Sequence, residues 1–326
     1  MHIADVLAEL GADPDRVIRN AGLELSLFSD SENIISRPAL EGLVRESVQA
    51  TGCDHLGLRI GVTATSHPYG LLGDLLQHCS TVGTALAYFQ QHFHLHDRIG
   101  VATRSVEGSR GALGYTLIEG SSAETDHIHD AAIAIAMTSM RVLVGPDWKP
   151  RAVTLPRRKP RNVQPYVKVF GVLPQFEAEH PGLHFSARDF DRPIAGADPD
   201  RFALLIEKIR TVADAGDIDF VEQVRRALRG LIALRRCSAD DLAGTFSMSR
   251  RHLNRKLAER GVSYRQIHDE ARWTLAERML LRTDKSLMEI SAALNYADAS
   301  AFSRAFKGWK GESPSEWRKR ARAAEQ

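Results

Sequence analysis

The strongest constraint on the fold is a pattern of two helices and a tight turn that occurs twice in the last third of the chain. In the first copy, residues 240–246 form a short amphipathic segment, and Ser249 stands where a side-chain cap would start a second helix over residues 250–259. The second copy follows about 48 residues later, over residues 287–294 and 299–309. A supersecondary unit that repeats in this way predicts an all-α domain built from two related helix pairs.

The first helix pair has the residues of a helix-turn-helix, a motif whose second helix lies in the major groove of DNA. Leu253 and Leu257 give this second helix an inward face. Its opposite side carries four polar residues near the N-terminal half, which is the part that reaches base edges: Arg250, Arg251, Asn254 and Arg255. Arginine forms two hydrogen bonds with guanine and asparagine forms two with adenine, so these side chains predict direct recognition of base sequence.

The second helix pair carries smaller side chains. Asp298 is a candidate N-cap, and Phe302 and Phe306 face inward. The exposed side is formed by the remaining residues of that helix's first turns: Ala299, Ser300, Ser303, Arg304 and Lys307. Because Ala299 cannot hydrogen-bond a base edge, this helix either reads a thymine methyl group or serves mainly as a phosphate anchor.

A long amphipathic segment separates the two pairs. Residues 264–281 follow a candidate N-cap at Ser263 and carry one apolar stripe, formed by Tyr264, Ile267, Ala271, Leu275 and Met279. A helix of this length spans roughly 27 Å. It could therefore hold two recognition helices near the ~34 Å separation of successive major grooves on one face of DNA. One chain could then contact two grooves without forming a symmetric dimer.

Charge is divided unevenly along the chain. Residues 1–220 hold 21 Lys and Arg against 28 Asp and Glu, a net charge of −7. Residues 221–326 hold 22 against 13, a net charge of +9. This asymmetry favours a polyanion as the partner of the C-terminal part.

The N-terminal part mixes both kinds of secondary structure and is predicted to be one α+β domain over residues 1–197. A connector over residues 198–217 follows, and the all-α domain occupies residues 218–326. We expect helices near residues 5–10, 16–21, 38–50, 81–92 and 126–144, a hairpin from residues 99–104 and 112–118, and short strands at 152–155, 175–177 and 182–186. Residues 199–212 are expected to form a connecting helix.

Six stretches of the C-terminal part identify a family: residues 249–257 (SRRHLNRKL), 263–264 (SY), 276–281 (AERMLL), 290–291 (IS), 300–307 (SAFSRAFK) and 311–318 (GESPSEWR). In order and spacing they resemble the AraC/XylS regulators, over about residues 218–322. The resemblance implies a linker helix between two helix-turn-helix motifs. It places base-reading residues at Arg251, Asn254 and Arg255 in the first motif, and at Ala299, Ser300, Ser303 and Arg304 in the second.

The two turns depart from the family pattern. The first turn usually has glycine where this chain has Ser247, and the second has Asn295. Asparagine tolerates the left-handed backbone region, whereas serine there costs about 1 kcal/mol. We therefore expect a slight distortion of the first turn.

The N-terminal part also resembles a family, through residues 11–14 (GADP), 21–23 (AGL), 57–61 (GLRIG), 70–73 (GLLG), 84–86 (TAL) and 166–176. These stretches are similar to the effector-binding domain of AraC-type regulators of the ornithine-utilisation kind. The resemblance implies ligand sensing or dimerisation and names no ligand.

One feature is typical of metal binding and not of DNA recognition. It is a histidine cluster, His92, His94 and His96, with His127 and His129 downstream. On a strand the first three imidazoles would share one face and could hold zinc or iron. The segment instead joins a helix to a strand, so we expect no metal and no other cofactor there. Cys53 and Cys79 lack the basic neighbours of a reactive thiol. No motif of nucleophilic catalysis or nucleotide binding occurs, and no enzyme activity is expected.

The sequence thus predicts a sequence-specific DNA-binding transcription regulator, controlled by a small-molecule effector bound to residues 1–197. No signal peptide or membrane-spanning stretch is recognisable in the sequence, so we expect a cytoplasmic protein without membrane contact. Duplex DNA and the effector are its expected partners, and RNA polymerase and a second copy of the chain are compatible with this function. Two alternatives stay open: a histidine-metal enzyme domain tethered to DNA, and a dimeric regulator without an effector.

Overall fold

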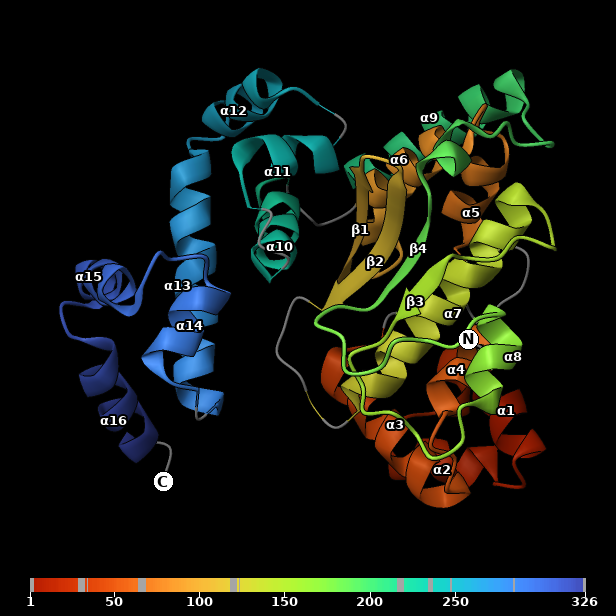
Figure 1. The fold of residues 1–326 in the computed structure, drawn as a ribbon, viewed down its shortest axis with the longest axis horizontal. Helices are drawn as coiled ribbons and strands as arrows, with labels where there is room; N and C mark the ends of the chain where they lie inside the picture. The colour runs from red at the N-terminus through yellow and green to blue at the C-terminus, as the bar shows by residue number, and fades with distance from the viewer. Residues whose placement is uncertain are drawn as a thin grey trace. The chain divides into compact units, whose positions relative to one another are not determined.

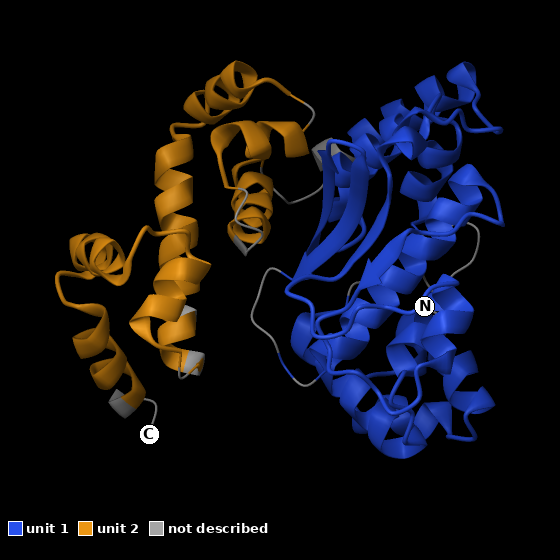
Figure 2. Ribbon diagram, in the orientation of Figure 1, with its two compact units in different colours: residues 1–215 blue, residues 216–326 orange. Residues whose placement is uncertain are grey.

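The computed structural model describes residues 3–28, 33, 35–63, 69–117, 122, 124–215, 220–233, 237–246, 248–283 and 285–324. They form two compact units, residues 1–215 and residues 216–326 (Figure 2). Each unit has its own hydrophobic core. Within the described ranges, no helix has the length and apolar character needed to span a membrane.

The first unit begins with short helices whose ends are set by local sequence: α1 (Ile3–Glu9), α2 (Pro14–Asn20), η1 (Leu25–Phe28), α3 (Arg37–Thr51), α4 (Leu56–Val62), α5 (Gly70–Gln77), α6 (Val82–His92) and η2 (Phe93–Leu95). Asp13 caps α2 by accepting from the amide of Asp15 at 3.1 Å. Ser36 caps α3, which ends at Gly52 in the left-handed conformation. Local sequence therefore sets the start of α2 and both ends of α3.

Four strands form one antiparallel sheet in the order β1-β2-β4-β3, with β1 at Gly100–Glu107, β2 at Arg110–Leu117, β3 at Ala152–Thr154 and β4 at Gly182–Ser186. The predicted hairpin is present, but its strands run closer to the turn than the sequence indicated. Glu107 pairs with Arg110, so only Gly108 and Ser109 connect the strands. Gly108 has a φ of 58°, a conformation that two-residue hairpin turns require and that glycine adopts without strain.

The predicted strand at residues 175–177 is wrong. Gln175 forms only an isolated bridge to Thr154. Glu177 has a φ of 60°, which lies outside the extended region and prevents a regular strand. The amides of Glu177 and Ala178 still donate to the backbone oxygens of Arg157 and Leu155, at 2.9 and 3.2 Å.

The remaining elements of the first unit surround a central helix, α7 (Thr125–Val144). This helix contacts β2 and β4 of the sheet, and also α4, α5 and α8 (Gln164–Phe170) (Figure 1). After η3 (Ala187–Asp191), the predicted connecting helix is formed as α9 (Pro199–Ala215). It packs on α5, and its residues Leu205, Ile206 and Ile209 are buried in the core of the first unit.

Helices α4 and α7 approach unusually closely, because α4 presents two glycines one turn apart. A Cβ atom added to Gly57 would lie 1.9 Å from the backbone oxygen of His127. One added to Gly61 would lie 2.5 Å from Cβ of Ala134 and 2.6 Å from the backbone oxygen of Ala131. Only glycine allows the two helix backbones to come this near.

The second unit contains only helices among its described residues: α10 (Phe220–Ala233), α11 (Ala239–Thr245), α12 (Arg250–Ala258), α13 (Tyr264–Arg282), α14 (Leu287–Ala293), α15 (Ala299–Lys310) and α16 (Pro314–Ala324). Helices α11 and α12 lie at the N-terminal end of α13, and α14 and α15 lie along its C-terminal half (Figure 1). Ser238, Ser263 and Ser286 each form a capping box, at the start of α11, α13 and α14.

The close approach of α4 and α7 gives a stability prediction. We expect Gly61→Ala to lower the free energy of unfolding of the first unit by about 1–3 kcal/mol, because the added methyl group overpacks the contact. Gly42→Ala in α3 is the matched control, since the nearest atom to its added Cβ would be the backbone oxygen of Ala21 at 4.0 Å. The control should gain up to about 1 kcal/mol from the better helix propensity of alanine. Urea unfolding of both variants measures the difference, and equal stabilities would show that the two helices do not pack at this distance.

Candidate nucleic-acid interface and ligand cavity

Helix α12 presents all four polar residues that the sequence assigned to it. The side chain of Ser249 accepts from the amide of His252 at 3.2 Å and starts the helix. Leu253 and Leu257 are fully buried. Arg250, Arg251, Asn254 and Arg255 are all exposed.

The charged side chains of α12 are held only loosely. Arg250 lies 3.8 Å from Asp240, and Arg255 lies 3.8 Å from Glu259, with all four side chains more than half exposed. Exposed pairs of this kind contribute at most about 1 kcal/mol, so phosphates or bases can replace the carboxylates. Within the part of the chain that the structure describes, Arg251 and Asn254 have no side-chain hydrogen bond or ion pair.

Helix α15 presents a smaller and less exposed surface. Asp298 caps it by accepting from the amide of Ala301 at 2.6 Å. Ser300, Arg304 and Lys307 are exposed, as the helical period predicts, whereas Ala299 and Ser303 are half-buried. The hydroxyl of Ser303 donates to the backbone oxygen of Ala299 at 2.7 Å, so toward a ligand it can only accept.

The turn before α15 is fixed by Asn295, which has the predicted left-handed backbone with a φ of 59°. Its side-chain amide donates to the backbone oxygen of Ile232 in α10 at 3.0 Å. Its own backbone oxygen accepts from Arg272 of α13 at 3.1 Å. The turn is therefore tied to two other helices. Ser247, in the first turn, lies outside the described residues.

Helix α13 holds the second unit together. It is 19 residues long, which corresponds to about 28 Å. Trp273 on this helix packs against Phe306, Trp309 and Trp317, with ring centroids 5.3, 6.1 and 6.0 Å away. These aromatic contacts fix the position of α15 on α13.

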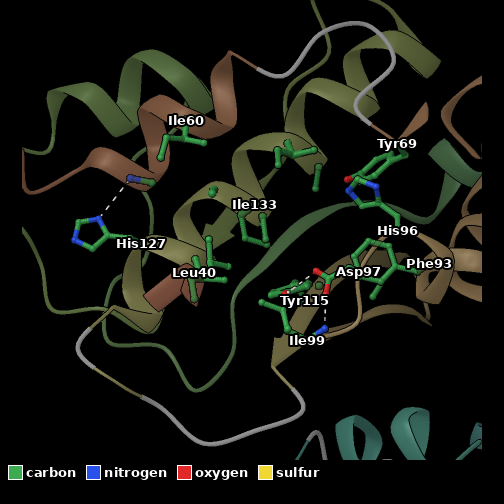
Figure 3. Close-up of a pocket in the computed structure, with 18 of the residues that line it drawn as sticks. Leu40, Ile60, Tyr69, Phe93, His96, Asp97, Ile99, Tyr115, His127 and Ile133 are labelled. Atoms are coloured by element: carbon green, nitrogen blue, oxygen red, sulfur yellow. Dashed lines mark hydrogen bonds between the residues drawn. The ribbon is translucent and has the colours of Figure 1, made fainter. Parts of the chain in front are cut away.

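A partly open cavity of about 200 Å³ lies in the first unit, between α3, α4, α7, the β1–β2 hairpin and the segment after α6. Its walls are mainly aliphatic and aromatic. In Figure 3, Leu40, Ile60 and His127 lie toward one end and Tyr69, Phe93 and His96 toward the other, with Ile133 between them. No sequence pattern indicates this cavity, since its lining residues come from many elements that are far apart in the chain: α1, α3, α4, α6, η2, β1, β2 and α7.

The polar groups of the cavity are largely satisfied by the protein itself. Asp97 accepts from the amides of Ile99 and Gly100 at 2.7 and 2.9 Å, and from the hydroxyl of Tyr115 at 2.9 Å (Figure 3). Burial raises the pKa of Tyr69 and of Tyr115, so both hydroxyls stay protonated. Burial also lowers the pKa of His127 to about 4, which keeps this imidazole neutral at pH 7.

The histidine cluster is spread over different surroundings. His92 ends α6 and stacks on Tyr88, with ring centroids 6.2 Å apart, whereas His96 meets the edge of Tyr69 at 5.0 Å. The residues do not form a strand, which is the geometry that would align their imidazoles. Among the described residues, no group of three or more His, Cys, Asp or Glu side chains is arranged to hold a metal ion.

The downstream histidine segment contributes a structural ion pair. Asp130 of α7 is fully buried, lies 2.5 Å from Arg157 and accepts from the hydroxyl of Tyr166 at 2.6 Å. Arg157 also donates to the backbone oxygen of Asp54 at 2.8 Å. The group joins α7 and α8 to the segment that precedes α4.

Comparison with known proteins gives matches over both units. Residues 11–194 match the arabinose-binding N-terminal domain of the AraC transcription regulator, and residues 242–320 match a helix-turn-helix domain. The HTH-type transcriptional regulator VirS of Mycobacterium tuberculosis is 24% identical over 319 residues, which cover 96% of this chain and 93% of VirS. The ornithine utilization regulator of Pseudomonas aeruginosa is 24% identical over 319 residues, covering 97% and 94%.

Among solved structures, the transcriptional regulator CdpR from Pseudomonas aeruginosa matches with a TM-score of 0.46 and 21% identity, covering 93% of this chain and 97% of CdpR.

The first of these matches spans more than half of the chain, and the second covers the helices that carry the exposed polar residues. Both relatives are transcription regulators, and this chain aligns with nearly the whole length of each. The chain is accordingly a DNA-binding transcription regulator, and it belongs to the AraC family.

Proposed function

We propose that the second unit binds DNA through two helix-turn-helix motifs, α11–α12 and α14–α15, joined by α13 as a linker helix. The observation that carries this proposal is the placement of two capped helix pairs along one helix of about 28 Å. That length is close to the ~34 Å between successive major grooves on one face of DNA.

The two motifs have different roles in this proposal. Arg250, Arg251, Asn254 and Arg255 of α12 contact base edges, because their side chains are long, exposed and weakly held. On α15, Arg304 and Lys307 contact phosphates, and Ala299, Ser300 and Ser303 pack against the groove. Ala299 and Ser303 are small and half-buried. This supports a contact in which the backbone of α15 comes close to the DNA, and not one made by long side chains.

The first unit is proposed to be the effector-binding part. It matches the ligand-binding domain of a regulator and holds a cavity, and small-molecule sites are concave and mostly apolar. An effector controls DNA binding only if it binds two arrangements of the protein with different affinity. We assign residues 1–197 to the effector domain, 198–217 to the connector and 218–326 to the DNA-binding domain. RNA polymerase and a second copy of the chain are the further partners that this function implies, in the cytoplasm.

The proposed base readers can be tested on the full-length protein. Asn254→Ala and Arg255→Ala should change which bases are preferred, at a cost of about 1–3 kcal/mol at the affected position. Lys307→Ala is the control and should weaken binding to all sequences alike. Affinities for single-base variants of a selected duplex measure both effects. If Lys307→Ala altered the base preference and Arg255→Ala did not, the proposed assignment of the two helices would be wrong.

The phosphate contacts predict a strong salt dependence. Affinity for duplex DNA should fall steeply as salt rises, because each neutralised phosphate releases condensed counterions. Lys307→Ala should make the plot of log affinity against log salt shallower by about one. Lys159→Ala, an exposed lysine of the first unit, is the matched control and should leave the slope unchanged. A wild-type affinity that stays constant between low and moderate salt would contradict phosphate binding altogether.

A further inference from the structure

We propose that the cavity of the first unit is the effector site and that it takes an uncharged, largely apolar molecule of roughly eight to ten non-hydrogen atoms, such as a medium-length aliphatic alcohol or a small bicyclic aromatic. The inference rests on the proposed function, since it names the chemical class of the effector.

The size of the ligand follows from the volume of the cavity. An apolar cavity of roughly 150 Å³ holds benzene in another protein. The volume here is about 200 Å³, which leaves room for a somewhat larger ring system or chain. The space exists because small residues stand where larger ones would fill it, on α7 and β1: Ala102, Ala131, Ala132 and Ala136.

The walls favour apolar atoms along most of the ligand. Aliphatic and aromatic side chains from both helices and strands face the cavity, among them Leu40, Ile60, Phe89, Phe93, Leu113 and Ile133. Contact with such walls stabilises a ligand in proportion to the apolar surface that it removes from water. Of the polar groups, His127 lies toward one end of the cavity, and Tyr69 and His96 lie toward the other (Figure 3). One hydroxyl or ring N–H of a ligand can be accommodated there.

The charges around the cavity disfavour an anion. None of the described lining residues is Lys or Arg, and the lining contains one carboxylate, Asp97. The charge of Arg37 acts to lower the pKa of Tyr115, so this cation is near the cavity. Arg37 does not line the cavity, however, and it is paired with Glu41 at 2.9 Å. A ligand carboxylate would lie near Asp97 without a cation, and a buried charge without a partner is strongly unfavourable.

A cation is disfavoured for a different reason. Asp97 already accepts three hydrogen bonds from protein donors, two of them from the backbone of the turn that leads into β1. Its charge therefore stabilises that turn and the Tyr115 hydroxyl. An ammonium group would lose its hydration shell and gain only a carboxylate that is largely occupied.

A sugar fits poorly, although the matching domain is named for arabinose. A monosaccharide has a hydroxyl on nearly every carbon, and each hydroxyl that is buried without a hydrogen-bond partner weakens binding. Besides Asp97, the polar side chains of the lining are Tyr69, Tyr115, His96 and His127. The Tyr115 hydroxyl is used by Asp97, and Nδ1 of His127 accepts from the amide of Gly57 at 3.4 Å.

The test is calorimetric titration of the full-length protein with probes of matched size. The probes are 1-octanol and indole as uncharged apolar ligands, octanoate and octylamine as charged counterparts of the same chain, and L-arabinose. We expect 1-octanol and indole to bind and the other three to bind at least about tenfold more weakly, or not at all. Equal or tighter binding of octanoate, octylamine or arabinose would overturn the proposed ligand class.

Two variants place the binding in this cavity. Ala136→Met fills it and should weaken 1-octanol binding by about tenfold. Leu40→Ala enlarges the cavity, because Leu40 lines it, and should shift the preference from 1-octanol toward 1-decanol. Leu40 is only half-buried, so this variant should still fold. Leu173→Ala is the matched control, since this leucine is 56% exposed and does not line the cavity. If neither cavity variant changed 1-octanol affinity, the ligand would bind elsewhere and the proposal would fail.

DNA affinity measured with and without each probe separates this inference from the proposed function. If no apolar probe binds but another class of molecule alters DNA affinity, the ligand class is wrong and effector control stands. If 1-octanol binds in the cavity but leaves DNA affinity and transcription unchanged, the cavity chemistry stands and the cavity is not the effector site.

Discussion

The arrangement of the first unit depends on the close packing of α4 against α7. Gly57 and Gly61 let the two backbones approach to a distance that any side chain would prevent. Helix α7 is thereby fixed in contact with α4 as well as β2 and β4, and the hydroxyl of Tyr166 in α8 donates to its buried Asp130. The cavity is a consequence of the same design, because alanines on α7 leave space beside the sheet that the fixed helices cannot close.

The second unit holds the helices α12 and α15 in place and leaves their polar faces exposed. Buried leucines of α12 and buried phenylalanines of α15 anchor these helices in the core. Trp273 of α13 packs on the aromatic residues of α15 and α16. Asn295 ties the second turn to α10 and α13. The contacts that position α12 and α15 are made by their buried faces. The arginines and lysines on their exposed faces therefore remain available for DNA. The net charge of +9 over residues 221–326 suits this division.

The helices of the second unit could be predicted because their signals are local. Ser249, Ser263 and Asp298 cap helices within one residue of the expected starts, and leucines and phenylalanines at helical spacing identify the inner faces. The resemblance to AraC-type regulators is confirmed by the comparisons for both units. The cavity could not be predicted, because Leu40, Ile60, Tyr69 and Ile133 meet only after the chain has folded. Likewise, a run such as residues 175–177 looks like a strand until the backbone of Glu177 is known.

The measurement that tests the central claim most directly is hydroxyl-radical footprinting of the full-length protein on a selected duplex, at a protein-to-DNA ratio fixed by sedimentation. If α12 and α15 of a single chain occupy successive major grooves, one chain should protect two segments on the same face of the duplex, centred about one helical turn apart. Removing the exposed charges of α15 with Arg304→Ala and Lys307→Ala should weaken protection of one of the two segments and leave the other. Protection of a single segment by one chain, with a second segment appearing only when a second chain binds, would contradict the two-motif account.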